Sequence, residues 1–337
     1  MLAEELRRLV EAAEPGRALV LCHHNADPDA VCSAVALSEL LRILRSDLEV
    51  VCYAAEGPSK LSKRLLNYLG FEFAEHAEPG EAGILFMVDT NNTEQLEDLK
   101  KPVEERASQV PLVVIDHHAR HPRTEELAAL YIADDRASST CEIILRLYEE
   151  LGIPLSERVA RALFLGIAYD TRHLLLANAD TFLAVAKLVQ AGARPRELIP
   201  LLSVEMDYSE RVARLKACMR ARVFRFGDWL VALSHVSAFQ ASAARALLSL
   251  GAHLAIVAGE KEGRLRVSMR ATNDFASKTG IHLGRDLARP LGELINGMGG
   301  GHALSAGANG KGEPEEALEH CLRLLGELLG VGGKELK

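Results

Sequence analysis

The feature that most constrains this chain is a short apolar run that ends directly in an acid and two histidines, Val113-Val114-Ile115-Asp116-His117-His118. Three β-branched residues in a row, shortly after Pro111, are typical of a buried strand in a parallel sheet. Asp116, His117 and His118 would then lie at the carboxyl end of that strand, the edge at which open α/β sheets bind ligands. The histidine pair alone is a weak signal, because metal ligation, proton transfer and chance all remain open for it.

Two other predicted strands also end in polar residues. A buried strand at 18–22 runs into the loop His23-His24-Asn25-Ala26-Asp27-Pro28-Asp29, and a strand at 84–88 runs into Asp89. Helices are predicted after the first strand, at 29–44, and after a further strand at 48–53. This alternation of strands and helices predicts an α/β fold with a parallel, doubly wound sheet.

The pattern of strands and helices in the C-terminal part of the chain predicts a second, smaller domain. We expect a metal-binding domain at 1–190, a helical linker at 191–225 and a smaller α/β C-terminal domain with a mixed sheet at 226–337. Its predicted strands and helices lie at 229–236, 238–249, 253–259, 264–271, 283–295 and 314–329.

Composition excludes several classes of protein. The net charge of −8 argues against a general basic coat for nucleic acid. No apolar run approaches the roughly 20 residues of a membrane span, and the N-terminus does not resemble a signal peptide. The six cysteines are scattered, with no C-x-x-C pair, which is typical of reduced, structural thiols. We therefore expect a cytoplasmic protein without a membrane segment.

The polar residues at the predicted strand ends would share one cleft with an acid that follows a helix. Together they are His23, Asp27, Asp29, Asp89, Asp116, His117, His118 and Asp170. So many carboxylates would repel one another unless cations neutralise them. Carboxylate and imidazole ligands suit one Mn²⁺-like ion, or two ions bridged by one carboxylate. Taken singly, Asp29 could be a helix cap and Asp89 a turn residue.

In their order along the chain, these residues resemble a known family. The segment 23–29, Asp89, Asp116-His117-His118 and Asp170 look like the four motifs of the DHH phosphoesterase superfamily. Gly299-Gly300-Gly301-His302 is similar to the signature of the DHH-associated C-terminal domain. The resemblance covers about residues 15–310, and the short two-domain layout looks most like the nanoRNase/pAp-phosphatase (NrnA-like) group.

The resemblance implies two divalent metal ions, with Mn²⁺ preferred and Mg²⁺ or Co²⁺ as alternatives. Both ions would share Asp89, and His118 would face the scissile phosphate while Asp116 orients the histidines. The metal ligands implied are His23, Asp27 and Asp89 for one ion, and Asp29, Asp89, His117 and Asp170 for the other. The substrate contacts implied are Arg270, Gly299, Gly300, Gly301 and His302. Where the family usually has a glycine and a nearby aromatic, this chain has Arg172-His173-Leu174.

The function expected from this resemblance is a metal-dependent phosphodiesterase that converts very short RNA or linear dinucleotides to 5′-mononucleotides. A RecJ-like exonuclease acting on single-stranded DNA or RNA remains an alternative, supported by six basic residues and no acidic one within 211–225. A pAp phosphatase and a nucleotide-binding module without turnover also stay open. The glycine-rich signature argues against an inorganic pyrophosphatase. The sequence does not decide whether the protein forms a homodimer.

Overall fold

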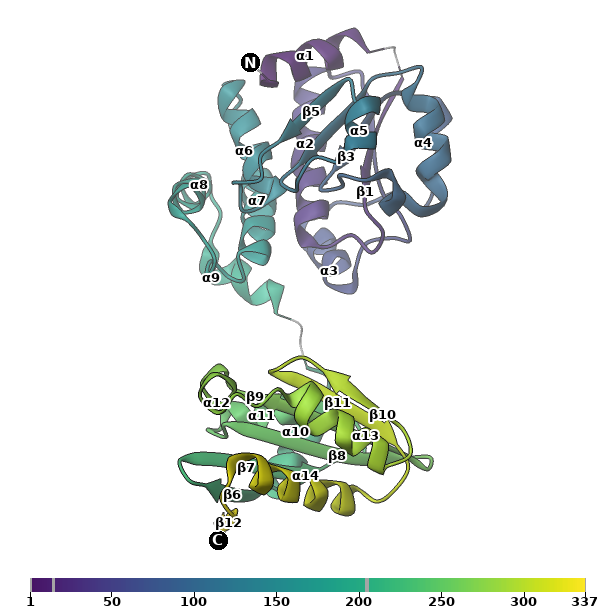
Figure 1. Ribbon diagram of the computed structural model, residues 1–337. Coiled ribbons are helices and arrows are strands. Elements are labelled where there is room, and N and C mark those ends of the chain that lie inside the picture. Colours follow the sequence, from purple (N-terminus) through teal and green to yellow (C-terminus); the bar gives the residue numbers. More distant parts are fainter. Residues whose placement is uncertain (1, 14–15, 204–205, 337) are drawn as a thin grey trace. The chain divides into compact units, whose positions relative to one another are not determined.

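The computed structural model describes residues 2–13, 16–203 and 206–336. The chain divides into two compact units, residues 1–204 and 205–337. Figure 1 shows the elements of each unit, and the two are described separately here.

The first unit is built on a five-stranded sheet with the strand order β2-β1-β3-β4-β5. All neighbouring strands are parallel. The strands are β1 (Arg17–Cys22), β2 (Glu49–Ala54), β3 (Ala82–Val88), β4 (Leu112–Asp116) and β5 (Leu130–Ala133). β3 and β4 are buried along their whole length, as expected for strands covered on both faces.

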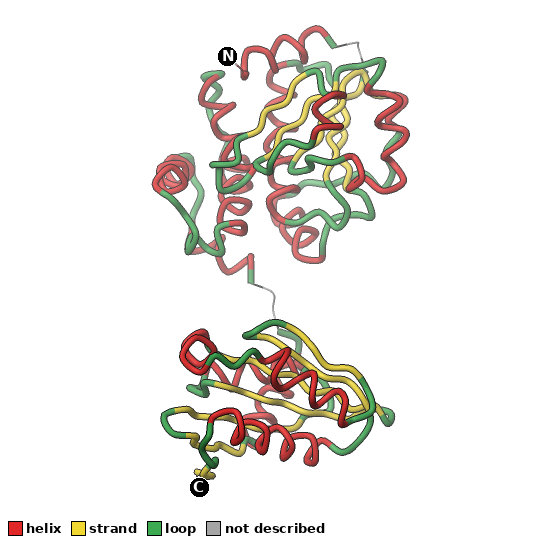
Figure 2. The backbone as a smooth tube through the Cα atoms, viewed as in Figure 1, coloured by secondary structure: helices red, strands yellow, loops and turns green. Residues whose placement is uncertain are grey.

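Helices cover both faces of this sheet (Figures 1 and 2). One face packs against α1 (Leu2–Ala12), α2 (Pro28–Leu44), α3 (Lys60–Leu69), α6 (Thr140–Glu150) and α7 (Glu157–Asp170). The other packs against η2 (Thr93–Leu99) and α4 (Lys100–Ala107), with the end of α5 (Pro122–Leu127). The remaining elements are η1 (Pro79–Glu81), α8 (Ala179–Gln190), α9 (Pro195–Leu198) and η3 (Ile199–Leu202). The predicted doubly wound sheet is thereby confirmed.

The strand order reverses next to β1, which pairs with β2 on one side and β3 on the other. The connection after β1 leads to β2 on one side and the connection after β3 leads to β4 on the other, so the loops after β1 and β3 diverge at the carboxyl ends of these strands. Such a switch point is where ligands bind in open α/β sheets. The polar ends of β1, β3 and β4 are neighbours at this point.

The second unit contains a seven-stranded mixed sheet with the order β10-β11-β9-β8-β7-β6-β12. The pair β7–β8 is parallel and the other pairs are antiparallel. The strands are β6 (Arg222–Phe226), β7 (Trp229–His235), β8 (Leu254–Lys261), β9 (Arg264–Ala271), β10 (Met298–Gly301), β11 (Ser305–Gly310) and β12 (Lys334–Leu336). The predicted mixed sheet is confirmed.

Two apolar clusters cover the two faces of this second sheet. On one face lie the π-helix η4 (Leu283–Ala288), α13 (Arg289–Leu294) and α14 (Pro314–Leu329), together with the core residue Phe275 of α12 (Asn273–Thr279). On the other lie α10 (Tyr208–Met219) and α11 (Gln240–Ser249), which pack on β7 and β8.

Some elements differ from the sequence prediction. The division near residue 204 differs from the predicted boundary at 190, because Leu198 and Leu202 are buried in the core of the first unit. The rest of the predicted linker is α10 and β6, and α10 buries Ala217 under the second sheet. The sequence did not predict the four-residue strand β5 or the strand β10, which contains Gly299–Gly301. Within the described residues, no helix combines the length and apolar character that crossing a membrane requires.

Candidate metal centre

The loop after β1 and the start of α2 hold two carboxylates in different ways. Asp27 caps α2, and its Oδ1 accepts hydrogen bonds from the backbone N–H groups of Asp29 at 3.0 Å and Ala30 at 3.2 Å. Pro28 occupies the first turn, where its missing N–H costs nothing. This cap fixes the turn that brings both acids to the sheet edge.

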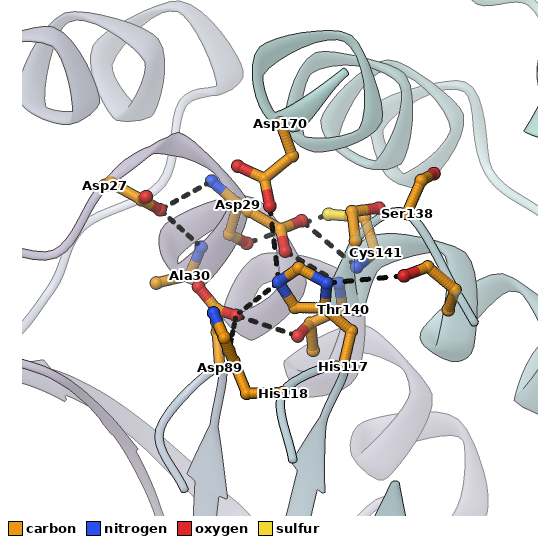
Figure 3. Close-up of polar contacts among 12 residues, drawn as sticks. Asp27, Asp29, Ala30, Asp89, His117, His118, Ser138, Thr140, Cys141 and Asp170 are labelled. Carbon is orange, nitrogen blue, oxygen red and sulfur yellow. Dashed lines mark hydrogen bonds and ion pairs between the residues drawn. The ribbon is translucent and has the colours of Figure 1, made fainter. Parts of the chain in front are cut away.

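Asp29 is fully buried and is bound by the start of another helix (Figure 3). Its carboxylate accepts hydrogen bonds from the backbone N–H groups of Thr140 at 2.7 Å and Cys141 at 3.1 Å, at the beginning of α6. The free N–H groups of a helix N-terminus stabilise an anion. Ser139 caps the same helix through its contact with the Glu142 N–H.

Asp89 lies directly after β3 at the centre of the cluster. Its backbone has φ +52°, in the left-handed region that few non-glycine residues adopt. The Thr140 hydroxyl donates to Asp89 Oδ1 at 2.9 Å. The Nε2 atoms of His23 and His117 lie 3.9 Å and 3.6 Å from the Asp89 carboxylate. Backbone strain of this kind is concentrated at functional sites.

The two histidines that follow β4 have different polar partners. Asp116 is fully buried, and its Oδ1 accepts hydrogen bonds from the His118 backbone N–H at 2.8 Å and ring Nδ1 at 2.7 Å. This hydrogen bond raises the pKa of His118 to about 9. His117 instead turns Nδ1 toward the Ala137 carbonyl at 3.4 Å and Nε2 toward Asp170 Oδ2 at 3.3 Å. Asp116 therefore orients His118, and His117 faces the carboxylates.

The raised pKa values of the carboxylates favour the presence of positive charge in the cluster. Burial, followed by the charge of Asp89, raises the pKa of Asp29 well above its ordinary value. Burial and then the charge of Asp116 raise the pKa of Asp89 in the same way. Asp170, at the last position of α7, has a pKa raised to about 7 by burial and by Asp27. A cation would remove the repulsion that these values express.

The donor set fits divalent metal ions. Three groups have ligand atoms within 4.8 Å of one another: His23, Asp27 and Asp89; Asp29, His117 and Asp170; and Asp89, Asp116, His117 and His118. His23 Nδ1 lies 2.8 Å from the His24 carbonyl. A proton on that nitrogen leaves the Nε2 lone pair free on the side of Asp89. Asp116 Oδ2 is buried without a hydrogen-bond partner among the described residues. The structure thus brings all six predicted metal ligands to one sheet edge.

Residues outside the predicted set complete this site. Thr140 and Cys141 hold Asp29, and Gly166 of α7 leaves room for both. A Cβ atom at Gly166 would lie 2.2 Å from Cys141 Sγ and 2.8 Å from Asp29 Oδ1. The sequence signalled the start of α6 through Ser138-Ser139-Thr140, but nothing local indicates that its N–H groups face an acid more than 100 residues earlier.

The predicted substrate residues of the second unit have different environments. Arg270 lines a cavity of about 670 Å³ with Gly300 and Gly301, and its guanidinium donates to the Met269 carbonyl at 2.8 Å. Gly300 faces open space, whereas a Cβ at Gly299 would lie 1.6 Å from the Ala288 carbonyl oxygen. Gly299 is therefore needed for packing against the π-helix. His302 is exposed at the end of β10.

The basic run at 211–225 is partly paired with acidic residues of the protein. Arg222 forms ion pairs with Glu315, Glu319 and Glu335. Arg214 pairs with Glu210 at 3.2 Å. The run therefore offers less free charge to phosphates than the sequence suggested.

The sheet architecture, the site and the order of its residues define a phosphoesterase of the DHH class. Residues 17–167 match the model of the DHH family, N-terminal domain, and residues 235–330 match that of the DHHA1 domain. The chain belongs to the DHH family and has the two-domain arrangement of its NrnA-like group.

Individual relatives extend over most of the chain. It is 36% identical to the uncharacterized protein MJ0988 of Methanocaldococcus jannaschii, over 94% of this chain and 93% of that protein. It is 25% identical to the bifunctional oligoribonuclease and PAP phosphatase NrnA of Thermus thermophilus, over 98% of this chain and 96% of the relative. The fold is similar to that of an exopolyphosphatase-related protein from Bacteroides fragilis, with a TM-score of 0.60 and 17% identity over 97% of this chain and 95% of that one.

Proposed function

We propose that this protein is a phosphodiesterase that uses two divalent metal ions, preferably Mn²⁺, to hydrolyse very short RNA or linear dinucleotides to 5′-mononucleotides. The observation that carries the proposal is the convergence of two ligand groups on one carboxylate. His23 and Asp27 form one group with Asp89, and His23 Nε2 lies 3.9 Å from Asp89 Oδ2. His117 forms a second group with Asp29 and Asp170, and its Nε2 lies 3.6 Å from Asp89 Oδ1. These contacts support a role for Asp89 as the ligand shared by two ions.

The ligand chemistry favours this assignment. Mixed carboxylate and imidazole donors suit Mn²⁺, and a bound metal pair would supply a hydroxide nucleophile and neutralise the oxygens of the phosphoryl group. Asp29 is held rigidly by two backbone N–H groups and Asp89 by the Thr140 hydroxyl. These contacts keep the acids in place before any ion or substrate binds.

His118 has a separate task in this proposal. Its side chain is 56% exposed, and its Nδ1 is fixed by Asp116 at 2.7 Å. A pKa of about 9 keeps the ring protonated at neutral pH. The imidazolium can therefore donate its Nε2–H to a phosphate oxygen, while Asp116 holds the ring in position.

The substrate class is inferred from the second unit and from one relative. Arg270 beside Gly300 offers a guanidinium and open backbone to a phosphate. The NrnA of Thermus thermophilus carries both oligoribonuclease and PAP phosphatase in its name, so phosphatase activity on pAp is a second candidate at the same metal centre. The single-strand exonuclease alternative loses support because Arg222 is paired with glutamates.

The proposal can be tested with a ladder of substrates. The full chain is incubated with Mn²⁺ and 5′-labelled RNA and DNA, from the dinucleotide to about 24 nucleotides, with pAp in parallel. We expect the highest kcat/KM on the shortest RNAs and no turnover by Asp89→Asn. Asp135→Asn, an exposed carboxylate outside the centre, is the matched control and should remain active. Faster degradation of the longest strand would support the exonuclease, and no turnover of any phosphate ester would refute the proposal.

A further inference from the structure

The peptide unit that joins Ala137 to Ser138 lies between a residue of the metal centre and a buried acid. Its carbonyl oxygen, on Ala137, lies 3.4 Å from Nδ1 of His117. Its N–H group, on Ser138, donates a hydrogen bond to Glu142 Oε2 at 3.2 Å. The C=O and N–H groups of a trans peptide point in opposite directions within one plane. The contact with Glu142 therefore also sets the direction of the carbonyl that faces His117.

Glu142 is a buried acid that packing alone does not explain. The residue is 5% exposed, and within the described part of the chain no basic side chain forms an ion pair with it. Its Oε2 accepts a hydrogen bond from the Ser138 hydroxyl at 2.6 Å, and the Thr181 hydroxyl lies 3.4 Å from the same oxygen. An apolar side chain of similar size would avoid the free-energy cost of burying a carboxylate. The hydrogen bonds with Ser138 are therefore the specific contribution of Glu142.

The loop that contains this peptide unit, residues 134–138, is held at both ends by α6. Arg146, one turn after Glu142 on α6, donates to Asp134 Oδ2 at 2.7 Å. The Ala137 backbone N–H donates to the Asp134 carbonyl at 3.1 Å. Because Arg146 holds the start of the loop in this way, the contact of Ser138 with Glu142 fixes its end.

The direction of the Ala137 carbonyl matters for the chemistry of His117. A backbone carbonyl can only accept a hydrogen bond, so Ala137 places the proton of the neutral imidazole on Nδ1. The lone pair of Nε2 is then presented beside Asp170 Oδ2, 3.3 Å away, and Asp89 Oδ1, 3.6 Å away. These three atoms can share one cation only when Nε2 has no proton.

We propose that Glu142 is a positioning residue that acts on His117 through the peptide unit before Ser138. By fixing that peptide unit, Glu142 sets the tautomer and the direction of the His117 ring, as outer hydrogen-bond partners of metal ligands do. It thereby favours binding of the ion that His117 shares with Asp29 and Asp170. The inference rests on the proposed function, because it assigns Glu142 a role toward the metal ions on which that function depends.

With this role for Glu142, the first turn of α6 supports three residues of the metal centre. The Thr140 N–H and hydroxyl donate to Asp29 and Asp89, and Glu142 adds His117 to these two. A displacement of the whole turn would disturb all three acceptors and donors together. The test must therefore separate the side chain of Glu142 from the helix that contains it.

Titration of the full chain with Mn²⁺ tests this role without any substrate. Electron paramagnetic resonance of the free ion gives the affinity of each site. Glu142→Met nearly keeps the volume of the side chain but removes the acceptor, and should weaken the binding of one ion by about 10- to 100-fold while the other stays within about 3-fold. Glu142→Gln keeps an oxygen that can accept from Ser138, so both affinities should stay within about 3-fold of wild type. Ser138→Ala removes only the hydroxyl contact and should weaken the same ion by about 3- to 10-fold.

A double-mutant cycle shows whether the effect of Glu142 passes through His117. In a His117→Ala background, Glu142→Met should reduce Mn²⁺ affinity by less than about 3-fold further. In a His23→Ala background, which lacks a ligand of the other ion, it should cause its full loss of about 10- to 100-fold. Glu39→Met is the matched control, because Glu39 is a half-buried acid on α2 that accepts from the Ser156 hydroxyl at 2.9 Å. It should lower the free energy of unfolding and leave both Mn²⁺ affinities unchanged.

The outcomes separate the role of Glu142 from the proposed function. That role is overturned if Glu142→Met binds both ions like wild type, if Glu142→Gln loses as much affinity as Glu142→Met, or if the losses from Glu142→Met and His117→Ala add. An equal loss of affinity in Glu39→Met also overturns it. If the Mn²⁺ affinities follow the expected pattern but Mn²⁺-loaded wild type hydrolyses no phosphate ester, the role of Glu142 stands and the phosphodiesterase proposal fails. Absence of Mn²⁺ binding by wild type would overturn both.

Discussion

Removing one acid from the metal centre should stabilise the metal-free protein at neutral pH. The carboxyl of Asp170 has a pKa of about 7 against an ordinary value of 3.8. Each pKa unit corresponds to about 1.4 kcal/mol, so ionising this group in the folded chain costs about 4 kcal/mol. Asp170→Asn keeps the shape and hydrogen-bonding capacity of the protonated acid but cannot ionise. It should therefore be more stable than wild type in EDTA.

The pH dependence of this stability difference follows from the raised pKa of Asp170. Between the two pKa values, folded Asp170 holds a proton that the unfolded chain has released, so the free energy of unfolding falls as pH rises through this window. The advantage of Asp170→Asn should grow from about 1 kcal/mol at about pH 4.5 to about 4 kcal/mol at about pH 7.5. For a unit of this size, this growth of about 3 kcal/mol corresponds to roughly 6–12 °C in Tm.

Adding Mn²⁺ should make wild type more stable than Asp170→Asn. Wild type gains stability from ions that bind only the folded state, whereas the variant has lost a ligand and gains less. Thermal unfolding is followed for wild type, Asp170→Asn and the surface control Asp135→Asn, with EDTA or Mn²⁺ at both pH values. The reasoning is refuted if Asp170→Asn is no more stable than wild type in EDTA at neutral pH, or if Mn²⁺ stabilises both equally.

Three further substitutions test the parts of the account that the structure added or redefined. Thr140→Val removes the 2.9 Å hydrogen bond to Asp89 and should lower Mn²⁺ affinity by about 10- to 100-fold in a metal titration; unchanged affinity would contradict a supporting role. Gly166→Ala places a Cβ 2.2 Å from Cys141 Sγ and should lower the free energy of unfolding by about 1–3 kcal/mol, with a denaturation midpoint like that of wild type as the contrary result. Arg270→Ala should raise KM by about 10- to 100-fold, the loss of one charged hydrogen bond; metal analysis must show unchanged Mn²⁺ content, because loss of metal would contradict a substrate role.

The sequence predicted the site residues best where these residues directly follow predicted strands. Asp89 and Asp116-His117-His118 follow buried β-branched or apolar runs, so their place at one sheet edge could be predicted from the alternation of strands and helices. The parallel sheet then required that they converge. The same argument placed His23, Asp27 and Asp29 beside them.

Contacts between distant segments could not be predicted in this way. The binding of Asp29 by the first N–H groups of α6 depends on how α6 and α7 pack on α2, which local pattern does not specify. Glycine has little strand propensity, so the sequence did not predict β10, which pairs with β11 along Gly299, Gly300 and Gly301. The basic run at 211–225 suggested a phosphate surface, but its charges are partly neutralised by glutamates far along the chain.

The central claim is that the acids and imidazoles at this sheet edge hold two divalent ions bridged by Asp89. Anomalous diffraction from crystals of the full chain grown with Mn²⁺ tests it directly. The account predicts two peaks about 3.5–4 Å apart, one bound by His23 and Asp27 and the other by Asp29, His117 and Asp170, with Asp89 bound to both. A single peak, or two peaks of which only one contacts Asp89, would contradict it.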